Sequence, residues 1–469
     1  MALNKKADRL GTEPIIPLLI KLSAPAVIGM LIQSLYNIID SIYIGHLSKE
    51  ALSAISLAFP IQLLLIAISV GTGVGTTSLI SRLLGRQEHN RANSVAEHVT
   101  FLSVIYGIVV AIIGYFFTED LIRIFTHDQV LIDLTTQYTR IILMGALALF
   151  VPIIGNNILR GEGNTFVPMV TMLIGAILNI ILDPLLIFGI GFFPELGIEG
   201  AAYATIFARL TSGIFVWIIL FSDKNQITLK LKQITFDPQI IIDVYKVGLP
   251  AMALQISAST MIAGVNKIVG SYSETAIAVF GIYFRLQSFV FLPIVGLTQG
   301  YMPIIGYNYG NNNSERMKKT IKSGAIISCI FTTVGFIIFQ FFTKELILLF
   351  NKDPQLLEVG TTALKRITLA FPIMGPAIIF STTFQAIGKG IPSLIHSTFR
   401  QILLLFPTMY LLSYLYGLDA LWFAIPIAEL IAAVIVTIWL VIVLHEVFKK
   451  MNEPTVTDKV GKVDKAKAK

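Results

Sequence analysis

The sequence is poor in cysteine and in charged residues. Its 469 residues include a single cysteine, Cys329, which lies inside an apolar stretch. One thiol excludes an internal disulfide framework and a metal site built from several thiolates. Charged residues make up 13% of the chain, whereas about 25% is usual in soluble globular proteins. This scarcity of charge argues against a chain that folds in water.

The sequence signatures of enzymes and of nucleotide-driven pumps are also missing. No HExxH, GxSxG or P-loop pattern is present, and no segment looks like a nucleotide-binding domain. A membrane enzyme, one alternative, would need a catalytic cluster at one membrane face, but the histidines are scattered over joints and helix ends. They are His46, His89, His98, His127, His396 and His445. We therefore expect a monomeric non-enzyme without a cofactor and without a nucleotide partner.

Apolar residues, in contrast, are abundant. They make up 55% of the chain, and nearly all of residues 14–448 consists of apolar stretches separated by short polar joints. Such stretches can cross a hydrocarbon layer about 30 Å thick as helices, whose backbone is hydrogen-bonded internally. The alternating pattern of a membrane β-barrel is not visible. We expect an all-α integral membrane protein with twelve transmembrane helices, at residues 15–44, 52–83, 93–117, 131–158, 165–190, 197–221, 239–269, 276–307, 317–342, 356–387, 391–416 and 420–448.

Lysine and arginine are distributed unevenly over the joints. The two termini and alternate joints hold 22 of them, and the remaining joints hold four. The richer set comprises residues 1–14, 82–92, 159–163, 223–237, 308–322, 388–390 and the C-terminal tail. The positive-inside rule places this set and both termini in the cytoplasm, with the chain crossing the plasma membrane many times. The net charge of +7 then belongs to cytoplasmic loops and indicates no nucleic-acid partner.

The two halves of the chain repeat each other. A shift of 225 residues places Pro25 on Pro250, and the other coincidences are rich in glycine. They include Gly45 with Gly270, Gly71 with Gly296, Gly75 with Gly300, Gly85 with Gly310, Gln62 with Gln287 and Asp128 with Asp353. Glycine and proline fix close packing and kinks, so their coincidence indicates a duplicated scaffold. Two six-helix repeats around a central cleft are typical of alternating-access carriers; a channel also fits, but long re-entrant filter segments are absent.

The repeat divides the chain into five segments. They are a cytoplasmic N-terminus (1–14), an N-lobe with the first six helices (15–222), a cytoplasmic linker (223–238), a C-lobe with the last six helices (239–448) and a disordered basic cytoplasmic tail (449–469). No signal-peptide cleavage site follows the first helix, so we expect that helix to be retained. Contact of the tail with anionic lipid is a weaker alternative to plain disorder.

A polar stripe interrupts the first expected helix. Gln33, Tyr36, Asn37 and Asp40 recur at the spacing of one helix face. An ionisable side chain in a transmembrane helix is costly and usually functional, so the stripe should face the bundle or a watery cavity. The alternative is a polar seam between helices, but a carboxylate is a poor structural contact without a fixed cation.

A second set of polar residues lies on the fifth expected helix. Asn179 and Asp183 are one turn apart, Met172 lies on the same side, and Pro184 frees a backbone carbonyl. A structural role for Asp183, capping that kink, is the alternative. The next helix carries Thr205 one turn before an arginine.

Two further features of the first half are less specific. Arg209, one turn after Thr205, is expected to pair with a carboxylate. Asn156 and Asn157 follow Pro152 in the fourth expected helix, and we expect one to join helices and one to line a cavity.

The second half lacks the carboxylates of the first. Asp40 coincides with Val265, and Asp183 falls near Phe406 and Pro407. The charged residues of the second half, which we expect to pair with one another, are Lys267, Arg285, Arg400 and Glu429. Glu429 is a reserve candidate for a second ion site. Carboxylates with amide and hydroxyl oxygens suit a proton or a hard cation such as Na⁺, so a cationic compound would compete with that ion.

Three of these runs resemble the multidrug and toxic compound extrusion (MATE) family. QSLYNIID (33–40), followed by Gly45, is similar to helix 1 of that family, and LNIILDP (178–184) with GAAYAT (200–205) is similar to helices 5 and 6. Pro25 matches the bending first helix. The resemblance spans roughly residues 15–448.

The resemblance implies an efflux antiporter that exchanges lipophilic, mostly cationic drugs or toxins for H⁺ or Na⁺. By similarity, the ion-coupling residues are Asp40, Asn179, Asp183 and Thr205, with Na⁺ as a possible ligand of the two aspartates. The substrate-binding residues are Gln33, Tyr36, Asn37, Asn156 and Met172. A flippase for lipid-linked saccharides, from the same superfamily, is the alternative. It predicts a strongly basic cavity and often extra helices, which disagrees with twelve helices and two aspartates.

Overall fold

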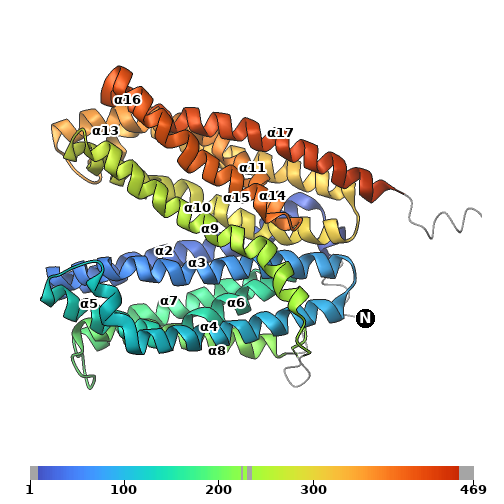
Figure 1. The fold of residues 1–469 in the computed structure, drawn as a ribbon, viewed down its shortest axis with the longest axis horizontal. Helices are drawn as coiled ribbons and strands as arrows, with labels where there is room; N and C mark the ends of the chain where they lie inside the picture. The colour runs from blue at the N-terminus through green and yellow to red at the C-terminus, as the bar shows by residue number, and fades with distance from the viewer. Residues whose placement is uncertain (1–8, 223–224, 230–234, 454–469) are drawn as a thin grey trace, which may run out of the picture.

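The computed structural model describes residues 9–222, 225–229 and 235–453 (Figure 1). These residues form helices and connecting loops without a strand. The first bundle holds α2 (Ile15–Leu47), α3 (Lys49–Gly85), α4 (His89–Arg123), α5 (Gln129–Met144), α6 (Leu147–Gly161), α7 (Phe166–Ile187) and α8 (Gly197–Leu220). The second holds α9 (Pro238–Gly270), α10 (Glu274–Gly310), α11 (Ser314–Phe341), α12 (Thr343–Leu348), α13 (Pro354–Ile367), η2 (Thr368–Ala370), α14 (Phe371–Ala386), α15 (Gly390–Thr398), the π-helical η3 (Phe399–Leu404), α16 (Leu405–Leu421) and α17 (Ala424–Asn452).

The helices account for twelve membrane spans. Eleven are long and apolar enough by themselves, and α5 with α6 makes the twelfth as a pair bent by 48°. The predicted all-α fold with twelve transmembrane helices is therefore confirmed. The single helix expected over 131–158 is instead broken at Gly145, where Ile206 of α8 occupies the space that a side chain would need. Glycine is a poor helix former, and Pro152 further on cannot donate to the helix ladder.

The chain ends depart slightly from the expected boundaries. Residues 9–12 are helical within the expected N-terminal segment, and α17 runs on through 449–452, where a disordered tail was expected. Lys449 and Lys450 suit this last turn because cations are favourable at a helix C-terminus. The rest of the expected tail, 454–469, lies outside the described residues, as do 1–8 and parts of the linker.

Equivalent residues start equivalent helices in the two repeats. The Ser48 hydroxyl accepts a hydrogen bond from the Ala51 backbone at the start of α3, and Ser273 does the same for α10. Asp128 caps α5, and Asp353 caps α13. These N-caps satisfy backbone donors that the first helical turn leaves free. The repeat in the sequence is thus a repeat of local structure.

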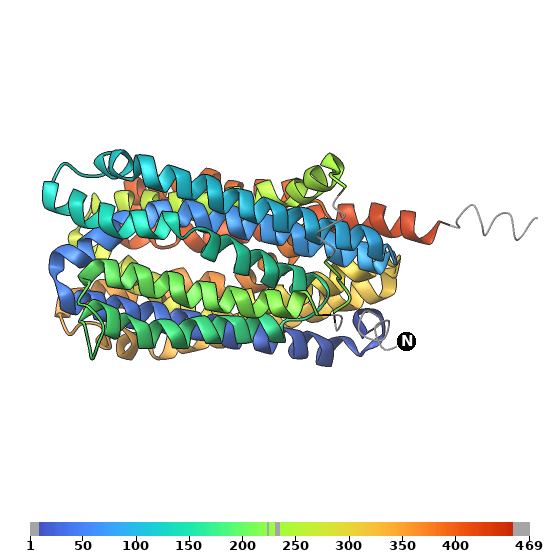
Figure 2. The same ribbon diagram turned by 90° about the horizontal axis from the view of Figure 1, so that it is seen from below.

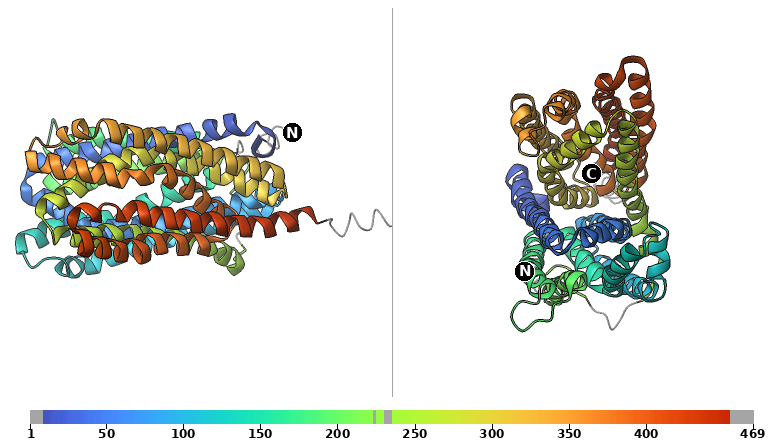
Figure 3. Two further views of the ribbon diagram at one scale, coloured as in Figure 1. Left: turned by 90° about the horizontal axis from the view of Figure 1, so that it is seen from above. Right: turned by 90° about the vertical axis from the view of Figure 1, so that its left-hand side faces the viewer.

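The two bundles lie side by side, with α2 and α3 of the first against α9 and α10 of the second. The end-on view in Figure 3 separates the blue-to-green bundle from the olive-to-red one, and Figure 2 shows the helices of the first bundle running along one common direction. One cluster of buried apolar residues draws on both bundles near the N-terminal end of the molecule, including Leu83 and Val244. The other clusters each belong to a single bundle.

Repeated glycines allow the bundles to touch at that end. A β-carbon on Gly75 of α3 would meet the backbone of Val244 in α9. Its repeat partner, Gly300 of α10, faces the backbone of Leu22 and Ser23 in α2. Gly85 and Gly310 form a second such pair, each facing the backbone of the opposite bundle. The glycines shared by the repeats therefore form a roughly two-fold contact between the lobes.

Polar contacts between the bundles lie toward the same end. Ser78 Oγ donates to the Gln385 carbonyl at 2.6 Å, and Asn308 Nδ2 donates to the Leu10 carbonyl at 3.0 Å. In the part of the chain that the structure describes, α2 beyond Met30 and α3 before Thr72 make no hydrogen bond or ion pair with the second bundle. The lobes are thus joined at the end near the N-terminus and are not joined by such bonds at the other.

Candidate functional site

Three helices of the N-lobe bring ionisable and polar side chains together away from the joined end. Helix α2 contributes Asp40, α7 contributes Asn179 and Asp183, and α8 contributes Thr205. Asn179 and Asp183 are one turn apart, so both side chains lie on the same face of α7. The helix α7 packs against both α2 and α8, which places that face between them.

The amide of Asn179 links α7 to α8. Its Nδ2 donates to Asp183 Oδ1 at 3.1 Å and to Thr205 Oγ1 at 3.4 Å. Asn179, Asp183 and Thr205 are all buried. Three of the four predicted ion-coupling residues are therefore joined in one hydrogen-bonded cluster.

The fourth predicted residue, Asp40, faces Asp183 across the helix boundary. The two carboxyls lie within hydrogen-bonding reach of each other. Asp40 Oδ1 and Asp183 Oδ2 are buried and have no donor among the described residues. A carboxylate only accepts hydrogen bonds, so two facing oxygens need a proton or a cation between them. The donor set therefore fits H⁺ or Na⁺, with oxygens from both aspartates.

A single cation balances part of this charge. Arg209 of α8 lies within electrostatic reach of Tyr36 and Asp40 of α2. The ion pair with a carboxylate that was expected for Arg209 is not found among the described residues; its charge acts on Asp40 without direct contact. Two ionised carboxylates and one guanidinium leave one negative charge in excess, and a single proton or monovalent cation would neutralise the cluster.

Two members of this neighbourhood escaped the sequence-based prediction. Gln62 of α3 donates from Nε2 to the Tyr138 hydroxyl of α5 at 3.3 Å, and Tyr138 lies within electrostatic reach of Asp40. The repeat singles out Gln62, because it coincides with Gln287, but gives no role to it. Tyr138 carries no sequence signal beyond a hydroxyl in an apolar helix.

The three predicted substrate residues of α2 differ in how deeply they are buried. Tyr36 is buried beside Arg209, Gln33 is half-buried, and Asn37 is exposed. Pro25 lies inside α2, which continues as one helix past it. Since no contact of Gln33 or Asn37 tests a substrate role, these assignments stay predictions.

The remaining predicted residues occupy different surroundings. Met172 of α7 packs on α2, with its sulfur 3.0 Å from the position a β-carbon on Gly29 would take. Thr77 donates to the Asn157 carbonyl at 2.9 Å, so Asn157 joins α6 to α3. Asn156 is buried, and its Oδ1 has no donor among the described residues. Of the two adjacent asparagines, Asn156 is thus the one whose side-chain oxygen is left without a donor in the described structure.

The C-lobe has a cavity of about 230 Å³ in the equivalent region. Phe284 and Gln287, the repeat partners of Phe59 and Gln62, are among its lining residues. Arg400 and Glu429 also line it and form an ion pair with each other.

This ion pair confirms one part of the expectation that the charged residues of the C-lobe pair with one another. Arg400 lies in the π-helical turn η3, which precedes Pro407. In the described part of the chain, Lys267 and Arg285 form no ion pair. The charges at the C-lobe cavity therefore cancel, unlike those of the N-lobe cluster.

Comparisons with known proteins agree with this architecture. The family model described as MatE matches residues 25–185 and 250–411, more than half of the chain. The chain is 30% identical over 437 residues to the FAD transporter of Shewanella oneidensis, covering 91% of this chain and 95% of that protein. It is 30% identical over 413 residues to the multidrug export protein MepA of Staphylococcus haemolyticus, covering 88% and 90%. A solved structure described as the outward-facing conformation of a multidrug resistance MATE family transporter has a TM-score of 0.87 at 29% identity, covering 93% of this chain and 99% of that one.

Proposed function

The chain belongs to the MATE family of multi-pass membrane transporters, and we propose that it exports lipophilic, mostly cationic compounds in exchange for H⁺ or Na⁺. One observation carries this proposal. The carboxyls of Asp40 and Asp183 lie close together in the N-lobe, and one buried oxygen of each has no donor among the described residues, in a cluster with one negative charge in excess. A transported cation can be bound there only where the carboxylates are free of their own ion, which is the condition for exchange.

The proposed coupling step follows from charge. When H⁺ or Na⁺ occupies the site of Asp40, Asn179, Asp183 and Thr205, the cluster is neutral and α2 can stay close to α7. When the ion leaves, the carboxylates repel each other and α2 is free to repack around Pro25. An organic cation that meets this negative charge then completes the exchange. Ion and compound compete for one group, so their movements are coupled.

The alternation of access follows from the contact between the lobes. They are joined at the end that carries the N-terminus. If both termini are cytoplasmic, as the distribution of lysine and arginine predicts, this conformation is closed to the cytoplasm and open to the outside. We propose that the N-lobe (15–222) and the C-lobe (239–448) rock about this contact in the plasma membrane.

The charge of the site favours cations over anionic cargo. One relative is named as an FAD transporter and another as a multidrug export protein. An anionic dinucleotide would meet the negative excess of the N-lobe cluster, whereas an organic cation is attracted to it. A flippase for lipid-linked saccharides is disfavoured for the same reason.

Reconstituted efflux tests the proposal. Purified protein in liposomes would transport a fluorescent lipophilic cation under an imposed pH gradient or an imposed Na⁺ gradient. We expect one of the two gradients to drive transport, and Asp40→Asn to abolish it. Asp120→Asn, which removes an exposed carboxylate at the end of α4, is the matched control. Transport by Asp40→Asn at the rate of the control would refute the N-lobe site, and no transport under either gradient would refute antiport of cations.

A further inference from the structure

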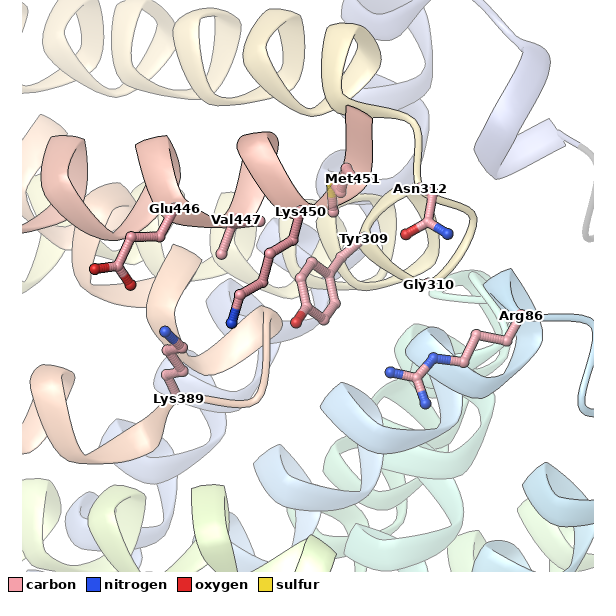
Figure 4. Close-up of a pocket in the computed structure, with 9 residues that line it drawn as sticks. All are labelled: Arg86, Tyr309, Gly310, Asn312, Lys389, Glu446, Val447, Lys450 and Met451. Atoms are coloured by element: carbon pink, nitrogen blue, oxygen red, sulfur yellow. The ribbon is translucent and has the colours of Figure 1, made fainter. Parts of the chain in front are cut away.

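A second pocket of about 380 Å³ lies at the joined end of the lobes, far from the carboxyl cluster (Figure 4). Its lining comes from both lobes. Arg86 at the end of α3 is the lining residue from the N-lobe. The C-lobe contributes the end of α10, the turn before α15 and the last turns of α17. The residues are Arg86, Tyr309, Gly310, Asn312, Lys389, Glu446, Val447, Lys450 and Met451.

The pocket has an excess of positive charge. Arg86, Lys389 and Lys450 stand against the single carboxylate of Glu446. Within the described ranges, neither Lys389 nor Lys450 forms an ion pair, and Arg86 lies only at 4.0 Å from Glu88. Figure 4 shows the ammonium groups of both lysines reaching into the same space as the Tyr309 hydroxyl. Three cations against one carboxylate leave an excess of positive charge, which a bound anion would balance.

The floor of the pocket is the contact between the lobes. The space beside Gly310 is filled by the backbone of Arg82 and Arg86 from α3. The Arg82 guanidinium packs where a side chain on Gly388 would lie, in the turn that carries Lys389. These contacts place the N-lobe cation and the C-lobe cations around one cavity only while the lobes are joined.

We infer that this pocket binds a phosphate group, which bridges Arg86 of the N-lobe and Lys389 and Lys450 of the C-lobe. Phosphate oxygens accept charge-assisted hydrogen bonds from several cations at once, and the Tyr309 hydroxyl supplies a neutral donor. A bound anion then stabilises the joined arrangement of the lobes, because opening that end would separate the cations that share it.

One observation favours a phospholipid as the source of the phosphate. On α17, the residues four and eight positions before Glu446 are Ile442 and Ile438, and both are exposed. They lie on the same face as Lys450, which follows Glu446 by four positions. An apolar stripe that leads to a basic pocket suits acyl chains below an anionic headgroup. A soluble phosphate would use the same cations without the stripe.

The test measures binding to the purified full-length protein by native mass spectrometry. The lipid probes are phosphatidylglycerol and phosphatidylcholine, and inorganic phosphate is added as the soluble competitor. We expect phosphatidylglycerol to bind more tightly than phosphatidylcholine. We expect the Lys389→Gln/Lys450→Gln variant to weaken that binding by about thirtyfold and Arg86→Gln by about fivefold, given about 1 kcal/mol per cation near a lipid surface.

The matched control removes the same charge elsewhere at this end. Lys319→Gln/Lys322→Gln alters two exposed lysines of α11 outside the pocket and should leave binding unchanged. Displacement by inorganic phosphate would assign the site to a soluble phosphate, and its failure to displace the lipid would assign it to the headgroup. Unchanged binding in the pocket variants, or a change in the control as large as theirs, would overturn the proposal.

A conformational measurement tests the bridge itself. Spin labels on α3 and α17 near the pocket, in a Cys329→Ser background, would report the distance between the lobes. We expect phosphatidylglycerol to narrow the distance distribution in the wild type and not in Arg86→Gln. A distance distribution that does not change when the lipid is added would contradict the proposal that the lipid bridges the two lobes. Lipid binding is measured without the transported cation. A negative result for lipid binding therefore leaves the antiport proposal intact, and a negative result for antiport leaves the proposed phosphate site intact.

Discussion

The two lobes share a scaffold but differ in the charge that each one buries. The N-lobe holds Asp40 and Asp183 against one arginine, so its site needs an added cation. The C-lobe holds Arg400 against Glu429, so its site is neutral as it stands. The glycines, the helix caps and Pro25 with Pro250 agree in both halves, whereas the ionisable residues inside the membrane-spanning helices do not. The two halves therefore share their packing but not their buried charge, and our proposal for the coupling site rests on charge balance.

The largest contrast between the lobes should come from removing a carboxylate in each. Asp183→Asn would abolish ion-driven efflux, because it removes one of the two facing carboxyls and the negative excess. Glu429→Gln would leave ion coupling unchanged in the fraction of the variant that folds. Growth of cells that express each variant, in the presence of a toxic lipophilic cation, gives the measurement. If cells that express Asp183→Asn survive as well as wild-type cells, with equal amounts of protein in the membrane, then ion coupling does not depend on the N-lobe carboxyls and the proposed difference between the lobes is wrong.

The C-lobe pair should matter for stability instead. Glu429→Gln leaves Arg400 buried without its partner, and breaking a buried pair costs about 3–5 kcal/mol. Replacing both, in Arg400→Gln/Glu429→Gln, removes the uncompensated charge and should restore most of that loss. Thermal unfolding in detergent, followed through exposure of Cys329 to a thiol reagent, compares the variants. A double variant that is no more stable than Glu429→Gln would argue that the pair has a further role.

The shared glycines should behave alike in the two lobes. Gly75→Ala and Gly300→Ala each place a methyl group against the backbone of the opposite lobe, and overpacking of this kind costs about 1–3 kcal/mol. Both should shift the lobes away from the joined arrangement, as seen by spin-label distances across that end. Gly281→Ala is the control, since nothing lies within 4 Å of its added carbon. A response from only one of the two glycines would break the symmetry between the repeats.

The smallest expected effect compares Tyr138→Phe with Gln287→Ala. Tyr138→Phe removes the hydrogen bond from Gln62, worth about 0.5–1.5 kcal/mol, and should slow efflux a few-fold by loosening the surroundings of Asp40. Gln287→Ala alters the repeat partner of Gln62, which lines the C-lobe cavity, and should leave the initial rate of efflux unchanged. Slower efflux from Gln287→Ala than from Tyr138→Phe would point to the C-lobe cavity as part of the transport path.

The sequence was sufficient for the class of fold and for the polar residues of the N-lobe, because apolar length and helical spacing act locally. Helical spacing could not bring the carboxyls of Asp40 and Asp183 together, since their contact depends on how α2 packs against α7; only the family resemblance put both in one site. The sequence offered three basic residues as partners of Glu429, and the packing of η3 on α17 selects Arg400, which is 29 positions away. The bend at Gly145 was missed for a similar reason: the residue that fills the space beside it, Ile206, comes from α8.

The most direct test of the N-lobe account is a count of the ions that a bound organic cation displaces from the purified protein. Release of H⁺ or Na⁺ would be measured as a saturating lipophilic cation is added to weakly buffered wild type, Asp40→Asn and Arg400→Gln/Glu429→Gln. Charge balance predicts about one ion per chain for the wild type and the C-lobe variant, and none for Asp40→Asn. Release that persists in Asp40→Asn but is lost from the C-lobe variant would contradict the account and move the coupling site to the C-lobe.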